Sequence, residues 1–169
     1  MILIDRNRIS NRVTELAKEI DKSRDLTVPL VVISILNGSI VFTADLVRQL
    51  SGIVYLDSIK ASSYKGTTSS GVVSITNTLD IPNIETKDIL LVDDILDSGL
   101  TLHNITSVIS NMKPKSIKTC VLLDKKDCRK ISFESTYVGF NIDNKFVVGY
   151  GLDYNGLYRN QQDIHILNS

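Results

Sequence analysis

This chain of 169 residues lacks the features that mark membrane and nucleic-acid-binding proteins. Its 19 basic residues are balanced by 19 acidic ones and form no basic run, so no large positive field is available to hold nucleic acid. Its longest apolar run, Leu30–Leu36, is far shorter than a membrane span. The first residues, MILIDRNRIS, contain no apolar stretch of signal-peptide length. We therefore expect a cytoplasmic protein with neither a nucleic-acid nor a membrane partner.

Cysteine and histidine are scarce, with two residues of each. Cys120 lies in an apolar run and is expected to be a small buried side chain, whereas Cys128 lies in a charged one. The spacing of these cysteines is typical of neither a metal site nor a redox motif, and no disulfide is expected. His103 and His165 are isolated from other ligand-type residues, so neither predicts a metal site or a catalytic dyad.

Apolar residues make up 43% of the chain and charged residues 22%, which is ordinary for a globular protein of one domain, here 1–169. Helical spacing or an amphipathic pattern predicts helices, and β-branched or alternating runs predict strands. The expected helices are 5–22, 40–50 and 99–112, and the expected strands are 30–36, 53–60, 88–94 and 116–123. This order predicts an α/β fold with a doubly wound parallel sheet, in which ligands bind at the carboxyl ends of the strands.

Two segments break this pattern. The stretch 61–71, ASSYKGTTSSG, is small and polar, which is typical of a mobile loop. Near the C-terminus, two β-like runs, 137–142 and 145–152, precede a polar tail. We interpret them as an appended substructure, because no helical pattern lies between them.

The strongest chemical signal is the run ILLVDDILDSGLTL at 89–102. A buried strand leads into the adjacent carboxylates of Asp93 and Asp94, which suit a diol or Mg²⁺. Ser98 and Thr101 then supply hydroxyl groups where the next helix begins, and free N–H groups at that end bind phosphate. Gly99 allows the backbone to approach a ligand closely. The run is neither a Walker A loop nor a GxGxxG turn.

The acids and hydroxyls of this run could also have only structural roles, but that interpretation explains single residues better than the whole cluster. Asp97 or Ser98 alone could cap a helix. Two neighbouring acids behind a buried strand repel each other unless a cation offsets their charge, which favours a binding site.

The run VDDILDSGLT, 92–101, resembles the phosphoribosyl pyrophosphate signature of the type I phosphoribosyltransferases, and the resemblance extends over nearly the whole chain. LNGSIVFTADL at 36–46 is similar to the pyrophosphate loop and its helix, and SSYKGTTSSG at 62–71 to the catalytic loop. LLDKKD at 122–127 and FVVGYGLDYNGLYRN at 146–160 are similar to the base-binding parts of the hypoxanthine (hypoxanthine-guanine) branch. The resemblance implies the type I phosphoribosyltransferase fold, with a small hood formed by terminal segments.

The resemblance also implies roles for the residues that bind phosphoribosyl pyrophosphate. Asp93 and Asp94 would hold the ribose hydroxyls, partly through Mg²⁺. The 5′-phosphate would lie against the backbone of the loop after them, and pyrophosphate against a loop with a non-proline cis peptide. Arg159 would contact pyrophosphate, and Asp153 would bind a second Mg²⁺ through water. The two loops comprise Ser98, Gly99, Leu100 and Thr101 for the 5′-phosphate, and Leu36, Asn37 and Gly38 for pyrophosphate.

For the base and the chemistry, the resemblance implies a second set of roles. Asp97 would be the general base at the purine N7, and Ser63 and Tyr64 would be the paired residues of the catalytic loop. Lys125 would donate to O6 and Phe146 would stack on the ring. Val147 would read the base through its backbone. Without the resemblance, Phe146 would be a core aromatic residue and Lys125 and Arg159 ordinary surface charges.

The resemblance therefore implies a purine salvage enzyme that joins hypoxanthine, and guanine, to the ribose of phosphoribosyl pyrophosphate in a homodimer or homotetramer. One alternative is a relative that prefers guanine or xanthine, since the sequence does not resolve which group meets the 2-position of the base. Another is a regulator that binds phosphoribosyl pyrophosphate without catalysis. The zero net charge and the set of Lys125, Phe146 and Asp153 favour the enzyme.

Overall fold

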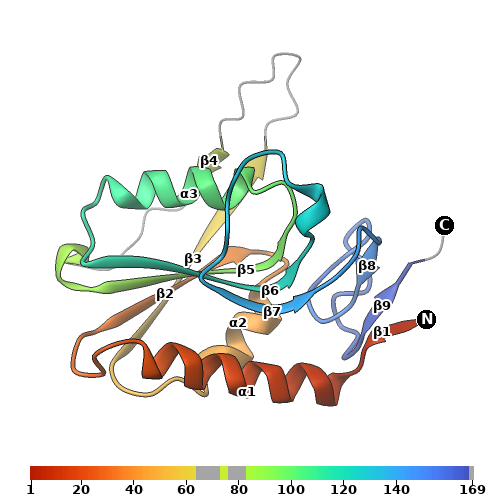
Figure 1. Ribbon diagram of the computed structural model, residues 1–169, viewed down its shortest axis with the longest axis horizontal. Helices are drawn as coiled ribbons and strands as arrows, with labels where there is room; N and C mark the ends of the chain where they lie inside the picture. Colours follow the sequence, from red (N-terminus) through yellow and green to blue (C-terminus); the bar gives the residue numbers. More distant parts are fainter. Residues whose placement is uncertain (64–72, 76–82, 168–169) are drawn as a thin grey trace.

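The computed structural model describes residues 1–63, 73–75 and 83–167, with the backbone alone at 61–63 and 73–75. Its main sheet has six strands in the order β4-β3-β2-β5-β6-β7, of which β4 pairs antiparallel with β3 and all others are parallel. A three-stranded sheet, β1-β9-β8, lies at one end and joins the two terminal regions (Figure 1). The helices are α1 (Arg6–Lys22), α2 (Ile40–Val47) and α3 (Leu100–Ser110), with 3-10 turns η1 (Ile84–Thr86) and η2 (Lys126–Cys128). The strands are β1 (Ile2–Ile4), β2 (Leu30–Leu36), β3 (Val54–Ser63), β4 (Val73–Ile75), β5 (Asp88–Leu96), β6 (Ser116–Asp124), β7 (Tyr137–Asn141), β8 (Val147–Val148) and β9 (Ile164–Ile166).

Helices cover both faces of the main sheet, α1 and α2 on one side and α3 on the other (Figure 1). The central strands are therefore buried on both faces, and six of the seven residues of β2 are buried. Val32 and Leu90 pack toward α1 and α2, whereas Ile33 and Leu91 pack toward α3. The doubly wound parallel sheet and the hood predicted from the sequence are confirmed.

The first helix begins where a side chain caps it. The carboxylate of Asp5 accepts hydrogen bonds from the backbone N–H groups of Asn7 and Arg8, at 2.9 and 3.1 Å. Such a cap satisfies donors that have no partner inside the helix. The buried residues of α1 follow the helical spacing expected from the sequence: Ile9, Val13, Leu16, Ala17 and Ile20.

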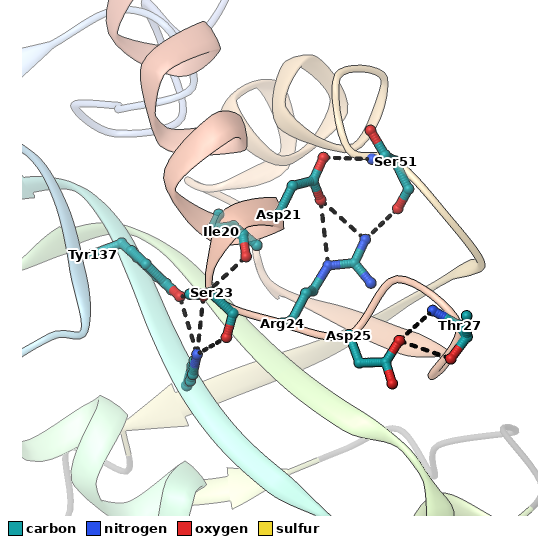
Figure 2. Close-up of polar contacts among 9 residues, drawn as sticks. Ile20, Asp21, Ser23, Arg24, Asp25, Thr27, Ser51 and Tyr137 are labelled. Carbon is teal, nitrogen blue, oxygen red and sulfur yellow. Dashed lines mark hydrogen bonds and ion pairs between the residues drawn. The ribbon is translucent and has the colours of Figure 1, made fainter.

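A polar network joins the elements at the amino ends of the strands (Figure 2). The carboxylate of Asp21 accepts from Arg24 and from the backbone N–H of Ser51, which ties α1 to the turn after α2. Lys118 donates to Ser23 and to the hydroxyl of Tyr137, at 3.0 and 3.3 Å, which ties α1 to β6 and β7. These contacts border a cavity of about 260 Å³ at this end of the sheet, lined in part by Ser23, Arg24, Lys118 and Tyr137.

The structure corrects three expectations. The helix expected at 40–50 ends at Val47, because the chain must turn through Gly52, at φ 77°, into β3. Residues 61–63, expected in the loop, continue β3 and pair with β4. The run at 137–142 is not part of an appended substructure, because β7 is an edge strand of the main sheet, parallel to β6. The irregular segment 125–136 replaces the usual crossover helix, which is why the sequence pattern concealed this strand.

Cys120 is fully buried, as expected, and both cysteines are free. None of the helices in the described part of the chain combines the length and apolar composition of a membrane span.

Candidate active site

The carboxyl ends of β2 and β5 lie side by side and form a cleft of about 280 Å³. The parallel register places the loop after each strand at the same edge of the sheet, which is where α/β proteins bind ligands. The cleft thus brings together residues from two segments that the sequence separates by more than fifty positions. Its lining comprises Ile35, Leu36, Gly38, Asp93, Asp94, Ile95, Leu96, Asp97, Ser98, Thr101 and Leu102.

The loop after β2 has the expected non-proline cis peptide, between Leu36 and Asn37. Gly38 in this loop packs directly against a carboxylate of the other segment. A Cβ atom added to Gly38 would lie 1.7 Å from Oδ2 of Asp94, so no other residue fits here without displacing that acid. The loop and the acidic pair therefore form one tightly packed unit.

Asp93 and Asp94 are the most perturbed acids of the cleft. Burial is the main cause that raises the pKa of both side chains, and for Asp93 the neighbouring charge of Asp94 raises the pKa further. The positive charge of Arg159 acts in the opposite direction on Asp94. Only 7% of Asp93 is exposed. A cation or a hydroxyl-rich ligand at this place would offset the cost of holding two carboxylates together.

The loop after β5 presents its backbone to the same cleft. Gly99 has a φ of 85°, a conformation that glycine adopts readily, and α3 begins at the next residue. The hydroxyl of Ser98 accepts from the backbone N–H of Leu100 at 3.3 Å, and Ser98 and Thr101 line the cleft. The free N–H groups of this helix start are suited to a phosphate.

Asp97 lies at the mouth of the cleft and is exposed. The residue at the cap position of α3 is Gly99, and the side chain that accepts from the first N–H of the helix is that of Ser98. The structural interpretation of Asp97 as a helix cap is therefore wrong. Its exposed carboxylate lies beside the thiol of Cys128, whose pKa is raised by burial and by the charge of Asp97.

Lys125 follows β6 and is far from an ordinary surface charge, because only 7% of it is exposed. Its backbone N–H donates to the carbonyl of Leu96 at 2.9 Å, which holds it next to the end of β5. Among the described residues, its ammonium group has no hydrogen-bond or ion-pair partner. The ammonium group is thus able to donate to a ligand, while the rest of the side chain is covered by the protein.

Phe146 and Val147 are neighbours in the hood, but Phe146 is exposed and Val147 is buried. The ring of Phe146 is 53% exposed, so the core-aromatic interpretation is wrong, and it packs edge-on against Tyr154 with ring centres 5.6 Å apart. Val147 is buried in β8, where it pairs with Ile166 of β9. The exposed face of Phe146 is free to stack on a planar ligand.

Asp153 and Arg159 form an ion pair, which the sequence did not predict. The carboxylate of Asp153 accepts from Arg159 at 2.7 Å and from the backbone N–H of Gly156 at 2.7 Å. Arg159 also donates to the carbonyl of Gly151 at 2.6 Å. A Cβ atom on Gly151 would lie 2.2 Å from the carbonyl oxygen of Gly38, so this hood loop rests directly on the loop after β2.

The side chains of two expected catalytic residues, Ser63 and Tyr64, lie outside the described part of the chain. Tyr64 is outside the described residues, and of Ser63 only the backbone is described, as the last residue of β3. One residue that the sequence analysis missed is Arg129, which bonds to the ends of both β5 and β6. In the run KKDCRK it has the pattern of a surface charge, and no motif signals it.

Comparison with known proteins places the chain in a family. Residues 3–155 match the family described as phosphoribosyl transferase domain, and the chain therefore belongs to the phosphoribosyltransferases. The hypoxanthine-guanine phosphoribosyltransferase of Aquifex aeolicus is 46% identical over 98% of this chain and 93% of its own length. The enzyme of the same name from Bacillus subtilis is 41% identical over 98% and 92%. The crystal structure of a hypoxanthine-guanine phosphoribosyltransferase from Bacillus anthracis superposes with a TM-score of 0.94 at 41% identity, covering 99% of this chain and 98% of the other.

Proposed function

We propose that this protein is a purine salvage enzyme, a hypoxanthine phosphoribosyltransferase of the pentosyltransferase class. It transfers the 5-phosphoribosyl group from phosphoribosyl pyrophosphate to N9 of hypoxanthine, and of guanine, giving the nucleoside monophosphate and pyrophosphate. The observation that carries the proposal is the cleft itself. One phosphate-type loop, one acidic pair and one cis-peptide loop meet there, with a buried lysine at its side.

The reaction separates charge, and the cleft is suited to both parts. Breaking the bond from C1′ of the ribose to pyrophosphate leaves positive charge on the sugar and negative charge on the leaving group. Asp93 and Asp94 hold the ribose hydroxyls close to the developing positive charge. Backbone N–H groups of the loop 36–38 and the guanidinium of Arg159 face the leaving pyrophosphate, and the loop 98–101 anchors the 5′-phosphate. Such preorganised groups stabilise a transition state without reorganising during the reaction.

The base is held on the edge that carries O6 and N7. Lys125 donates to O6, Phe146 stacks on the ring and Val147 contacts the base through its backbone. Asp97 accepts the N7 proton while the bond to N9 forms, and a general base of this kind contributes on the order of 10²–10⁴-fold. Ser63 and Tyr64 would complete the set of catalytic residues, and Tyr64 lies outside the described residues.

The acidic pair fits Mg²⁺. In the described part of the chain, no three or more His, Cys, Asp or Glu side chains gather as a metal cage. Mg²⁺ is nonetheless commonly bound by one or two carboxylates together with substrate phosphates and waters. Asp93 and Asp94 would supply the carboxylates, since a bound cation favours their charged forms, and Asp153 would hold a second ion through water. Bound Mg²⁺ would neutralise negative charge on the leaving pyrophosphate.

A direct assay tests the proposal. Purified protein with phosphoribosyl pyrophosphate, Mg²⁺ and hypoxanthine should form inosine monophosphate and release pyrophosphate in equal amounts. Competition among hypoxanthine, guanine and xanthine then identifies the preferred base, and a preference for guanine or xanthine would favour the alternative enzyme. Binding of phosphoribosyl pyrophosphate without any product from the three bases would favour a regulator.

The proposal includes a homodimer or homotetramer acting in the cytoplasm on small molecules. Exposed apolar side chains gather near α2 and β3, where Ile40 is 53% and Leu56 59% exposed, which supports burial against another subunit. Light scattering after size-exclusion chromatography measures the subunit number.

A further inference from the structure

Arg129 connects the two residues that are proposed to read one edge of the base. Its NH1 nitrogen donates to three backbone carbonyls: those of Leu96 at 2.9 Å, Asp97 at 2.7 Å and Lys125 at 3.2 Å. Asp97 follows β5 and Lys125 follows β6, so one nitrogen bonds to the backbone of both. The contact fixes these two positions relative to each other.

The rest of the guanidinium holds Arg129 itself in place. Its Nε donates to the carbonyl of Phe133 at 3.0 Å, and its NH2 forms an ion pair with Asp124. Only 14% of the Arg129 side chain is exposed, and that of Asp124 is completely buried. Because Asp124 neutralises the guanidinium and the donors are directed to the protein, Arg129 acts on the backbone and does not bind the substrate.

Two backbone hydrogen bonds continue the same connection. The N–H of Lys125 donates to the carbonyl of Leu96 at 2.9 Å, and the N–H of Lys130 donates to the carbonyl of Ser98 at 3.0 Å. The segment after β6 is thereby tied to the segment after β5 on both sides of the guanidinium. Planar guanidinium, with five donors in a fixed fork, is suited to hold several carbonyls in one geometry, whereas the ammonium of a lysine is not.

We propose that Arg129 is a positioning residue that sets the spacing between Asp97 and Lys125, and so the fit of the O6 and N7 edge of the purine. The inference rests on the proposed function and extends it to a residue that does not touch the substrate. In purines these two atoms lie next to each other, so a general base at N7 and a donor at O6 must keep a fixed separation. A displacement of about 1 Å at such a site can lower activity by about 100-fold.

The test compares Arg129→Gln and Arg129→Lys with Arg12→Gln. Arg12 is the matched control, because it also donates to two backbone carbonyls, of Val138 and Gly139 at 2.8 and 3.0 Å, but lies on α1. Steady-state kinetics give kcat and the KM of each substrate. The inhibition constant of purine, which lacks the 6-oxo group, reports base binding without the contact to Lys125. Melting temperatures monitor the fold.

Arg129→Gln should raise the KM of hypoxanthine about 10-fold or more and lower kcat, while the KM of phosphoribosyl pyrophosphate changes less than about 3-fold. The inhibition constant of purine should change much less than the KM of hypoxanthine. Arg129→Lys should change the same constants in the same directions by smaller factors. If Arg129→Gln does not fold, the kinetics of Arg129→Lys provide the test. Arg12→Gln should lower the melting temperature and leave the kinetic constants unchanged.

Equal effects of Arg129→Lys on both substrates and on purine would overturn the positioning role, as would a control that reproduces the pattern. A wild-type protein that makes no nucleoside monophosphate would instead overturn the proposed function, and the inference with it. The two failures are therefore distinguishable by the wild-type assay alone.

Discussion

At the scale of single residues, three carboxylates of one cleft differ mainly in their surroundings. Asp93 is buried, Asp94 packs against Gly38, and Asp97 is exposed at the mouth. The first two have raised pKa values because burial disfavours their charged forms. Acids of the same chemistry are therefore suited to different tasks, the buried pair to a cation or diol and the exposed one to proton transfer.

Asp97→Asn should lower kcat while the binding of phosphoribosyl pyrophosphate stays nearly intact. Asparagine keeps the size of the side chain but cannot accept the N7 proton, so we expect a fall of about 10-fold or more. The melting temperature should not change, because Asp97 caps no helix. Asp127→Asn, at an exposed acid of the neighbouring turn, is the control. A near wild-type kcat would remove Asp97 from the mechanism.

Lys125→Ala should raise the KM of the base more than that of phosphoribosyl pyrophosphate. Loss of a charged hydrogen bond to O6 costs about 1.5–3 kcal/mol. Lys126→Ala removes a charge from the exposed neighbouring residue and should leave both constants unchanged. If Lys125→Ala affected both substrates equally, Lys125 would not be a base-reading residue.

The acidic pair should make the ligand-free protein less stable as pH rises. A carboxyl whose pKa is raised by folding keeps its proton in the native state at pH values where the unfolded chain has lost it, so the free energy of unfolding falls above about pH 4. Asp93→Asn should therefore stabilise the protein in chelator by about 1–2 kcal/mol at neutral pH, or about 2–8 °C in melting temperature.

The measurement is thermal unfolding at a series of pH values above about 4, the ordinary pKa of an aspartate, where the unfolded chain has already lost this proton. The gain from Asp93→Asn should grow with pH, whereas Asp143→Asn, at a side chain 81% exposed, should give no such trend. If Asp93→Asn stabilised the protein equally at every pH, burial of the Asp93 charge would not destabilise the folded state.

At the scale of elements, the hood and the main sheet meet at two glycines. The carbonyl of Gly38, in the loop after β2, lies against Gly151 of the hood, which has a φ of 98°. The same hood segment carries Arg159, which contacts Gly151, and Asp153, its ion-pair partner. The position of the loop after β2, which is proposed to bind pyrophosphate, thus depends on a segment more than a hundred residues away.

Gly151→Ala should weaken the binding of phosphoribosyl pyrophosphate by about 10-fold or more, since a displaced binding loop costs this much. The added methyl group would meet the carbonyl of Gly38, so one of the two loops must move. Gly156→Ala is the matched control, because Gly156 also has a positive φ, of 80°, but no atom lies within 4 Å of its added Cβ. Both variants should lose about 1 kcal/mol of stability from backbone strain. Equal binding in both would show that the contact is not needed.

At the scale of the whole molecule, two distant parts of the chain meet beside the cleft, where Gly151 of the hood lies against Gly38. The main sheet and the loops after β2 and β5 line the cleft, and the hood, built from both terminal regions, carries Phe146, Asp153 and Arg159, which are proposed to bind the base and pyrophosphate (Figure 1). A ligand that spans both parts should stabilise the folded protein as a unit.

Phosphoribosyl pyrophosphate with Mg²⁺ should raise the free energy of unfolding by about 2.7 kcal/mol at a ligand concentration of 100 times Kd. The melting temperature should rise accordingly. Excess chelator should abolish most of this increase together with activity, because the acidic pair then lacks the cation. Thermal unfolding and the nucleotide assay, each with and without chelator, measure both effects. Full activity in excess chelator would contradict the role of Mg²⁺.

The sequence by itself determined the central sheet and the phosphate loop, because both depend on local patterns. The run Leu30–Leu36 forms β2 at the bounds that its apolar composition predicts. Asp93 and Asp94 lie near the carboxyl end of β5, and the hydroxyls of Ser98 and Thr101 follow the strand. Local hydrophobicity and helix starts are readable along the chain. The sequence did not predict that β7 belongs to the main sheet, because irregular backbone connects β6 to β7 where a crossover helix is usual.

Only the tertiary structure decided the contacts between segments far apart in sequence. The approach of Gly151 to Gly38, the ion pair of Asp153 with Arg159 and the bonds from Arg129 to two strand ends all depend on how the loops fold over the sheet. The burial of Lys125 and the exposure of Phe146 contradict the average behaviour of these residue types. Burial and hydrogen bonding are set by the whole fold, so residue type and spacing do not determine them.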